Sequence, residues 1–190
     1  MDLYLCSKSP RRADILSKNS VAYKIIENKL EDEVADMSLR PFDQIVNIAY
    51  MKSTASKSNF KGIILGADTG IIIDQKLIGK PSSEEDALRI LTFLNGQTHM
   101  VVSACCLLNT INNTIDFCID YTNVTFKHIS TQQIKDYITK AQPMDKAGAY
   151  AIQDNPSFIQ SISGELDTVI GLPMNKLLKL FRHYGIVKSC

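Results

Sequence analysis

Strand-like and helix-like segments alternate along this chain of 190 residues. The run Ile63–Leu65 is apolar at every position, which is typical of a strand that is buried on both faces of a sheet. Segments with apolar residues at helical spacing separate this run from other strand-like runs. An alternation of this kind favours an α/β or α+β fold built around a mixed sheet. The composition, 45% hydrophobic and 22% charged, is that of an ordinary globular domain with a sizeable core.

Turn and capping signals set the expected element boundaries. Proline at positions 10 and 41 suits the start of a helix, where its missing N–H costs no hydrogen bond. Ser82 with Glu85, and Ser130 with Gln133, have the spacing of capping boxes that begin two further helices. The glycine-rich segment 66–70 is expected to break a buried strand. The expected strands are 3–6, 22–26, 63–65, 71–73, 77–78, 100–108 and 115–126, and the expected helices are 10–18, 41–56, one between residues 82 and 96, 131–140 and one around 177–181.

Charge and cysteine usage limit where this protein works and what it binds. The net charge of +1 argues against a general nucleic-acid coat, so any basic site must be local. No apolar run is long enough to span a bilayer, and the N-terminal segment lacks the pattern of a signal peptide. The five cysteines are odd in number and include no CxxC pair, which is typical of neither a disulfide framework nor a zinc site. The sequence therefore predicts a cytoplasmic protein that binds neither membrane nor nucleic acid, and it leaves a homodimer open.

The segment from Ser7 to Arg12 has the chemistry of a phosphate-binding turn. It follows an apolar run of strand length and precedes a helix, for which Ser9 is a suitable N-cap. Free N–H groups at a helix N-terminus attract anions, and Arg11 and Arg12 add full positive charge there. The alternative is a solvated basic turn that only caps the helix.

Four further side chains are unusual for a scaffold. Asp68 lies in the expected break after a buried strand, and strand ends are where sites in α/β sheets gather. Lys80 is held between a glycine and a proline, and Gln153 ends the stretch 145–153, which is rich in small residues. Lys52 continues the apolar stripe of a helix, so it either snorkels at the edge of the core or points into a cleft.

Each of these side chains also has an ordinary role open to it. Asp68 could form a turn, Lys80 could be a solvated lysine, and Gln153 could be an exposed amide. Together, however, they supply cations for phosphates, carboxylates for a metal and an amide for the edge of a base. That combination suits the hydrolysis of a nucleotide phosphoanhydride.

These segments, in this order, resemble the Maf family of nucleoside triphosphate pyrophosphatases nearly from end to end. The resemblance implies an elongated α/β fold with a mixed sheet flanked by helices, similar to inosine-triphosphate pyrophosphatases, with two lobes around a cleft. It also implies a single Maf-like domain over residues 1–190. The matching segments are 7–12, 32–33, 49 with 52, 66–69, 79–81, 96 with 99, 145–148, 152–153 and 169–173.

The resemblance further implies the reaction and the residues that perform it. A nucleoside triphosphate would be hydrolysed to the monophosphate and pyrophosphate, with a divalent metal, Mg²⁺ or Mn²⁺, as cofactor. Asp68 carries over as the general base and a metal ligand, and Glu33 as a second, metal-linked acid. The residues that carry over as phosphate contacts are Ser7, Arg11, Arg12, Lys52 and Lys80.

Arg12, Thr69 and Gln153 match the branch of the family that hydrolyses dTTP and UTP, with modified pyrimidine nucleotides also open as substrates. A glutamine amide has both a donor and an acceptor, which suits a uracil or thymine edge.

Three positions depart from the family pattern. Cys6 stands where alanine is usual, and Ala151 and Asp154 stand where glycines are common. Because Asp154 is next to Gln153, which the resemblance assigns to base reading, it bears most on base preference.

Two other functional classes compete with the enzyme. A non-catalytic nucleotide-binding regulator, linked to cell division, would keep the basic turn but could lose the acids. Asp68 and Glu33 are both present, which favours the enzyme. An RNA-binding module is disfavoured by the near-neutral charge and the lack of a basic face with interleaved aromatics.

Overall fold

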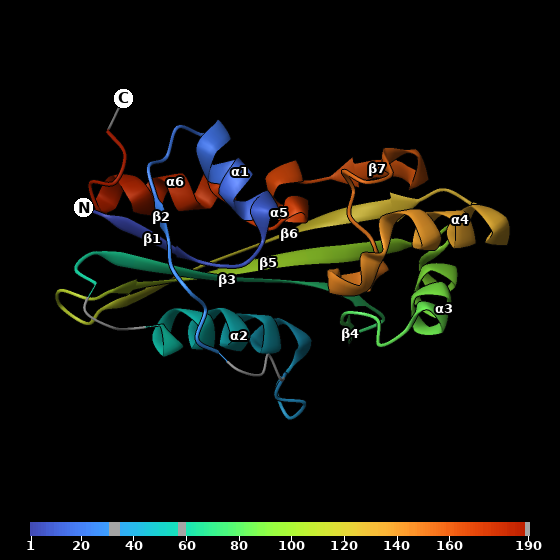
Figure 1. Cartoon of the computed structure of the whole chain (residues 1–190), viewed down its shortest axis with the longest axis horizontal. Helices are drawn as coiled ribbons and strands as arrows, with labels where there is room; N and C mark the ends of the chain where they lie inside the picture. The colour runs from blue at the N-terminus through green and yellow to red at the C-terminus, as the bar shows by residue number, and fades with distance from the viewer. Residues whose placement is uncertain (31–34, 57–59, 189–190) are drawn as a thin grey trace. The chain divides into compact units, whose positions relative to one another are not determined.

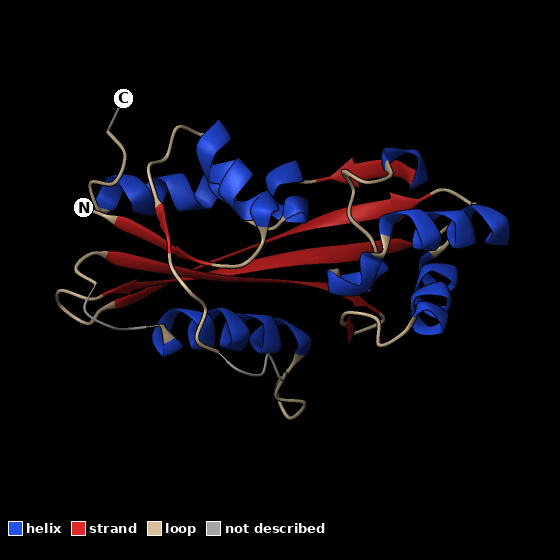
Figure 2. Ribbon diagram, viewed as in Figure 1, coloured by secondary structure: helices blue, strands red, loops and turns tan. Residues whose placement is uncertain are grey.

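The computed structural model describes residues 1–30, 35–56 and 60–188, which form a mixed sheet of seven strands with helices on it (Figure 1, Figure 2). Six strands follow the order β2-β1-β3-β5-β6-β7, and β4 pairs with β3 off this path. The α/β prediction is therefore confirmed.

The chain divides into two compact units. The first is made of Met1–Asp68, Ser103–Asp120 and Gly171–Cys190, and the second of Thr69–Val102 and Tyr121–Ile170. A single domain with a cleft between lobes stays a prediction.

The first unit is built around parallel strand pairing. β1 (Leu3–Cys6) pairs in parallel with β2 (Lys24–Ile25) on one side and with β3 (Ile63–Ile73) on the other. Every residue of β1 is buried, as expected for a strand inside a covered sheet. The helices of this unit are α1 (Pro10–Lys18), α2 (Pro41–Ala55) and α6 (Met174–His183).

Helices α6 and α2 cover opposite faces of the sheet in this unit (Figure 1). On β6 (Ile115–Phe126), Asp120 forms an ion pair with Lys176 of α6 at 2.7 Å. Phe117 is an odd number of residues away, so it points to the other face. Its ring centroid lies 6.4 Å from that of Tyr50 on α2.

Helix α2 lies directly on strand β3 at Gly66. A Cβ atom at this position would be 2.3 Å from the carbonyl oxygen of Ala49 and 2.7 Å from the backbone nitrogen of Ser53. Only glycine permits so close an approach of two backbones. The side chains of α2 are therefore placed next to the middle of β3.

The second unit has its own hydrophobic core. β4 (Lys76–Ile78) forms an antiparallel hairpin with β3, and β7 (Ile159–Ser163) pairs antiparallel with β6. Helices α3 (Glu84–Leu94) and α4 (Thr131–Ala141) contribute to the core, and the short helix α5 (Leu166–Ile170) follows β7. The core of this unit includes Ile71, Ile73, Leu91, Leu94, Val124, Phe126, Ile134, Tyr150 and Phe158.

The predicted break at 66–70 is wrong. β3 is one strand of 11 residues, so Asp68 lies in its middle and not at the end of a strand. The apolar runs on both sides of the segment are buried, and burial keeps the strand continuous across its glycines. Glycine inside a strand marks a close approach of another backbone, which here is that of α2 at Gly66.

The predicted start of α3 is also wrong, by one residue. Ser83 and not Ser82 is the N-cap, and its hydroxyl accepts a hydrogen bond from the Asp86 N–H. Ser82 instead donates its N–H and its hydroxyl to the Asp86 carboxylate. The expected strand 22–26 is reduced to Lys24–Ile25. The capping box of Ser130 and the helix that it begins are confirmed.

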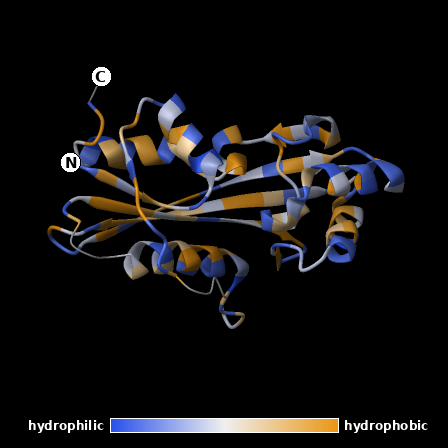
Figure 3. Ribbon diagram, in the orientation of Figure 1, coloured by the Kyte–Doolittle hydropathy of each residue, from blue (hydrophilic) through white to orange (hydrophobic). Residues whose placement is uncertain are grey.

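Several strands of the sheet carry long apolar runs (Figure 3). β5 (Thr98–Asn109) is buried continuously from Val101 to its end, so Cys105 and Cys106 are core residues. Within the part of the chain that the structure describes, no helix is both long enough and apolar enough to cross a membrane.

Candidate active site

The basic turn after β1 is held by its own side chains. Ser7 Oγ accepts hydrogen bonds from the Ser9 backbone N–H at 3.2 Å and from the Arg12 guanidinium at 3.1 Å. Arg12 Nε also donates to the Gly171 carbonyl at 3.0 Å. Ser7 and Arg12 are buried, whereas Arg11 is half-buried. Ser9 is at the N-cap position of α1 without a side-chain cap bond, so the turn is fixed mainly through Ser7 and Arg12.

Lys52 and Asp68 form a shielded ion pair. Lys52 Nζ lies 2.9 Å from Asp68 Oδ1, and the two side chains are only 6% and 17% exposed. The lysine therefore points inward to a carboxylate and does not snorkel to solvent. The close approach of α2 to β3 at Gly66, two residues before Asp68, makes this contact possible. Charge-assisted bonds of this length are strong and directional, so Lys52 orients the carboxylate.

The basic turn follows β1, and Asp68 of the ion pair lies on β3, the strand that pairs with β1 in the first unit. Cys6 is opposite Gly66 in the parallel register of β1 and β3, so Ser7 follows β1 beside the segment that holds Asp68. Cys6 Sγ also lies 3.2 Å from the Lys52 carbonyl oxygen and ties β1 to α2. Burial raises the pKa of the Cys6 thiol, so this departure from the family pattern packs and bonds as a neutral group.

In the second unit, two of the motifs that the sequence singles out are bonded to one another. The backbone N–H of Gly148 donates to the carbonyl of Gly79 at 2.9 Å, beside Lys80. Gly148 has a φ of 68°, which favours glycine, and a Cβ there would lie 2.1 Å from Cδ1 of Ile71. The small residue therefore lets the segment 145–153 pack against both β3 and the loop of Lys80, whose own side chain is exposed.

Gln153 is presented from a turn that is held at both ends. The Asp154 N–H donates to the Ala151 carbonyl at 3.1 Å, which closes the turn. The Ala151 N–H donates to the Tyr137 hydroxyl at 3.2 Å. Ile152 is buried, and Gln153 is exposed. The backbone is thus anchored while the amide that the sequence assigns to base reading faces outward.

Lys146 is a buried lysine that the sequence analysis placed in a motif but left without a role. Its Nζ lies 2.8 Å from Asp145 Oδ1 and 3.6 Å from Asp154 Oδ2, and its side chain is 10% exposed. One signal for this pair was available in the sequence. Asp154 is an acid at a position where glycine is common, and it follows the lysine by eight residues. Asp154 thus gives the lysine a second carboxylate.

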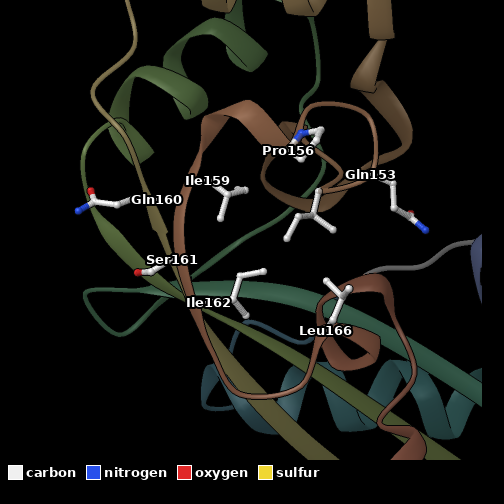
Figure 4. A pocket seen from close by; sticks show the side chains of 8 residues that line it. Gln153, Pro156, Ile159, Gln160, Ser161, Ile162 and Leu166 are labelled. Atoms are coloured by element: carbon white, nitrogen blue, oxygen red, sulfur yellow. The ribbon is translucent and has the colours of Figure 1, made fainter.

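A pocket of about 510 Å³ lies beside the turn of Gln153 (Figure 4). Ile159, Ile162 and Leu166 point toward its interior, and Gln153 extends from its rim. Its described lining carries no charged side chain, so it suits an uncharged ring better than a phosphate. The lining residues are Ile152, Gln153, Pro156, Ile159, Gln160, Ser161, Ile162 and Leu166.

Comparison with known proteins identifies the family. The family model described as Maf-like protein matches residues 2–184. The chain belongs to this family. It is 36% identical over 189 residues to a dTTP/UTP pyrophosphatase of Clostridium perfringens strain 13, with 98% of each chain covered. It is 34% identical over 186 residues to a dTTP/UTP pyrophosphatase of Bacillus cereus strain G9842, with 97% of this chain and 96% of that protein covered.

Among solved structures, a HAM1 protein from Coxiella burnetii is similar to this Maf-like chain with a TM-score of 0.44 and 13% identity. The match covers 66% of this chain and 73% of that chain. A match at this TM-score does not establish a shared fold. The expected similarity to inosine-triphosphate pyrophosphatases therefore stays a prediction.

Asp68 is the predicted metal ligand of this Maf-like chain that the structure describes. Mg²⁺ prefers carboxylate oxygens and takes waters and substrate phosphates as its other ligands. Lys52 engages Oδ1 of Asp68, and the side chain is exposed enough for solvent to reach it. Glu33, the second predicted ligand, lies outside the described residues. Among the described residues, no three His, Cys, Asp or Glu side chains gather as a metal site.

The structure gathers the predicted site residues of this Maf-like chain into two groups. Ser7, Arg11, Arg12, Lys52 and Asp68 belong to the first unit. Lys80 and Gln153 belong to the second, which begins at Thr69, directly after Asp68. Their roles in phosphate binding, catalysis and base selection stay predictions.

Proposed function

We propose that this protein hydrolyses dTTP and UTP to the monophosphate and pyrophosphate. The observation that carries the proposal is the shielded Lys52–Asp68 pair, which holds an oriented carboxylate near a basic turn. The similar proteins of C. perfringens and B. cereus, which align over nearly their whole length, bear the name dTTP/UTP pyrophosphatase. Modified pyrimidine nucleotides belong to the same proposal.

Positive groups bind the triphosphate in this proposal. Arg11 and the N-terminal end of α1 form the proposed anion site, and the Ser7–Arg12 bond holds its geometry in place. Lys52 and Lys80 are the proposed lysine contacts. A fixed cation in a shielded site stabilises developing negative charge better than a solvated one, because it needs no reorganisation.

Asp68 is the proposed general base. A water oxygen attacks the α-phosphorus and forms a bond to it, while a proton of that water passes to the Asp68 carboxylate. The bond from the α-phosphorus to the oxygen that bridges the α- and β-phosphates breaks, and pyrophosphate leaves with its electron pair. Because Lys52 engages Oδ1, the remaining oxygen, Oδ2, is the proposed proton acceptor.

Mg²⁺ or Mn²⁺ is the proposed cofactor, with Asp68 and Glu33 as its protein ligands. When bound, such a cation lowers the pKa of a water ligand and neutralises phosphate charge. The carboxylate chemistry of Asp68 supports this assignment.

Gln153, with Thr69 and Arg12, is proposed to set the base preference. Uracil and thymine present two carbonyl acceptors that flank one N–H donor, and the Gln153 amide can pair with part of that pattern. Cytosine has an amino group in place of one acceptor, so a positioned amide mispairs with it. The apolar side chains of the pocket beside Gln153 can cover a face of the ring.

The decisive experiment measures pyrophosphate release by the purified protein with Mg²⁺ or Mn²⁺, across the canonical nucleoside triphosphates and 7-methyl-GTP. We expect dTTP and UTP to have the highest kcat/KM. A purine at the top would refute the assignment to the dTTP/UTP branch. Nucleotide binding without any hydrolysis would favour the non-catalytic regulator linked to cell division.

A cytoplasmic location belongs to the same proposal. The described cysteines, Cys6, Cys105, Cys106 and Cys118, are all free and buried, which supports a reducing compartment. A homodimer and the lack of nucleic-acid binding stay predictions.

A further inference from the structure

Asp154 replaces a glycine that is common in the family, and the structure gives the substituted carboxylate a partner. Its Oδ2 lies 3.6 Å from Nζ of Lys146, whose side chain is 10% exposed. Asp154 is 34% exposed, so the pair is partly shielded from water. A glycine at this position would have no side chain to contribute, and its backbone would be freer to move.

The ion pair acts on the turn that carries Gln153. This turn runs from Ala151 to Asp154 and is closed by the Asp154 N–H bond to the Ala151 carbonyl at 3.1 Å. Its first residue is tied to α4 through the Tyr137 hydroxyl at 3.2 Å, and its last is tied to Lys146. Both ends are therefore anchored to side chains of the second unit.

The Gln153 side chain itself is not anchored by the pocket. It extends from the rim, away from the apolar side chains that point inward (Figure 4). An exposed glutamine has several rotatable bonds, so the position of its amide depends on how firmly its backbone is held. A site that selects by hydrogen bonds rejects a mismatched partner only as strongly as its donors and acceptors are fixed.

We propose that Asp154 is a positioning residue for base selection in this protein. Its ion pair with Lys146 fixes the turn from which Gln153 meets the base, and it thereby sharpens the discrimination of uracil or thymine from cytosine. This inference rests on the proposed function.

The test compares wild type with Asp154→Gly, Asp154→Asn and Tyr137→Phe, using kcat/KM for UTP and CTP. Asp154→Asn keeps the shape of the side chain and removes its charge, and Tyr137→Phe releases the other end of the turn. For each variant we expect the UTP-to-CTP ratio to fall about fivefold, the size expected of one partly exposed ion pair or one neutral hydrogen bond, with UTP itself changing less than the ratio. Hydrogen exchange at the residue 154 amide should become faster in both Asp154 variants.

Asp136→Asn is the matched control. Asp136 is an exposed carboxylate of the same unit that accepts a hydrogen bond from Gln132 at 2.7 Å, and its loss should leave the UTP-to-CTP ratio unchanged.

Equal slowing of UTP and CTP in the Asp154 variants, which leaves the ratio unchanged, would overturn the positioning role. If Asp154→Gly fails to fold, Asp154→Asn decides alone. If wild type hydrolyses UTP but the ratio does not move, only this inference fails. If wild type releases no pyrophosphate, the proposed function fails as well.

Discussion

The two units differ in how they place the site residues that the sequence predicts. The first unit buries Ser7, Arg12 and Lys52 and gives each a hydrogen-bond or ionic partner. The second unit leaves Lys80 and Gln153 exposed, although it also buries His99 and the paired Lys146.

This difference predicts a division of labour. Buried, paired groups keep one geometry, which suits the positioning of a reacting water and a phosphate. An exposed side chain takes its position from the backbone that carries it, which suits a group that tests the identity of a base. We expect substitutions at the buried pair of the first unit to change the rate for every nucleotide. Substitution of Gln153 should change which nucleotide is preferred.

Asp68→Asn should break catalysis most severely. The substitution keeps the shape of the side chain but removes its basicity, so we expect kcat to fall about 10²- to 10⁴-fold for every substrate. Asp120→Asn is the matched control, because Asp120 is a 19% exposed carboxylate of the same unit that is paired with Lys176 at 2.7 Å. Both variants should melt near wild type. Turnover at the wild-type rate in Asp68→Asn would show that Asp68 is not the base.

His99 should make the stability of the protein depend on pH. It is 2% exposed, its Nε2 lies 2.7 Å from the Tyr150 hydroxyl, and burial lowers its pKa from 6.5 to about 4. Below pH 6.5 His99 is protonated in the unfolded chain but stays neutral in the folded protein until the pH approaches 4. The free energy of unfolding should therefore fall as the pH drops from 6.5 to 4, by up to about 3 kcal/mol.

Denaturant unfolding of wild type and His99→Gln at several pH values checks this expectation. The variant should lose most of the extra slope between pH 6.5 and 4, whatever its stability at neutral pH. His183→Gln, at an exposed position, should keep the wild-type slope. Parallel pH profiles for wild type and His99→Gln would contradict a neutral, buried His99.

Lys52→Ala and Lys80→Ala sharpen the comparison, since one lysine is buried and the other exposed. A charge-assisted contact is worth about 1.5–3 kcal/mol, or about 10- to 150-fold in kcat/KM. We expect Lys52→Ala near the upper end and Lys80→Ala near the lower end, because water screens an exposed charge. Lys176→Ala and Lys76→Ala are the controls in the two units. If both site variants hydrolyse the substrate like wild type, the two lysines do not contact phosphate.

Gln153→Ala should produce the smallest loss of rate and the clearest change in preference. We expect the ratio of kcat/KM for UTP over CTP to narrow about tenfold, since one discriminating hydrogen-bonding group is lost, with less slowing of UTP itself. Gln132→Ala removes an exposed amide elsewhere in the second unit and should leave the ratio unchanged. An equal loss of kcat/KM for all nucleotides would show that Gln153 affects the rate and not the base preference. It would contradict the proposed difference in role between the two units.

Local signals in the sequence were enough to predict most of the elements. The strand Ile115–Phe126, the helix that begins at Pro41 and the capping box of Ser130 all lie where the sequence places them. Alternating side chains, a proline at the first helical position and a serine three residues before a glutamine act within a few residues of chain. Such patterns can be read without knowing what packs against them.

Contacts between distant segments were decided only by the tertiary structure. The glycines of 66–70 suggested a break, but the packing of α2 on Gly66 keeps β3 continuous. The same contact turns Lys52 from an ambiguous residue on an apolar stripe into the partner of Asp68. The sequence by itself determined which residue types are available for this chemistry. Which of them meet depends on how closely helix and strand approach, and that distance is set by a missing Cβ and by the burial of the surrounding core.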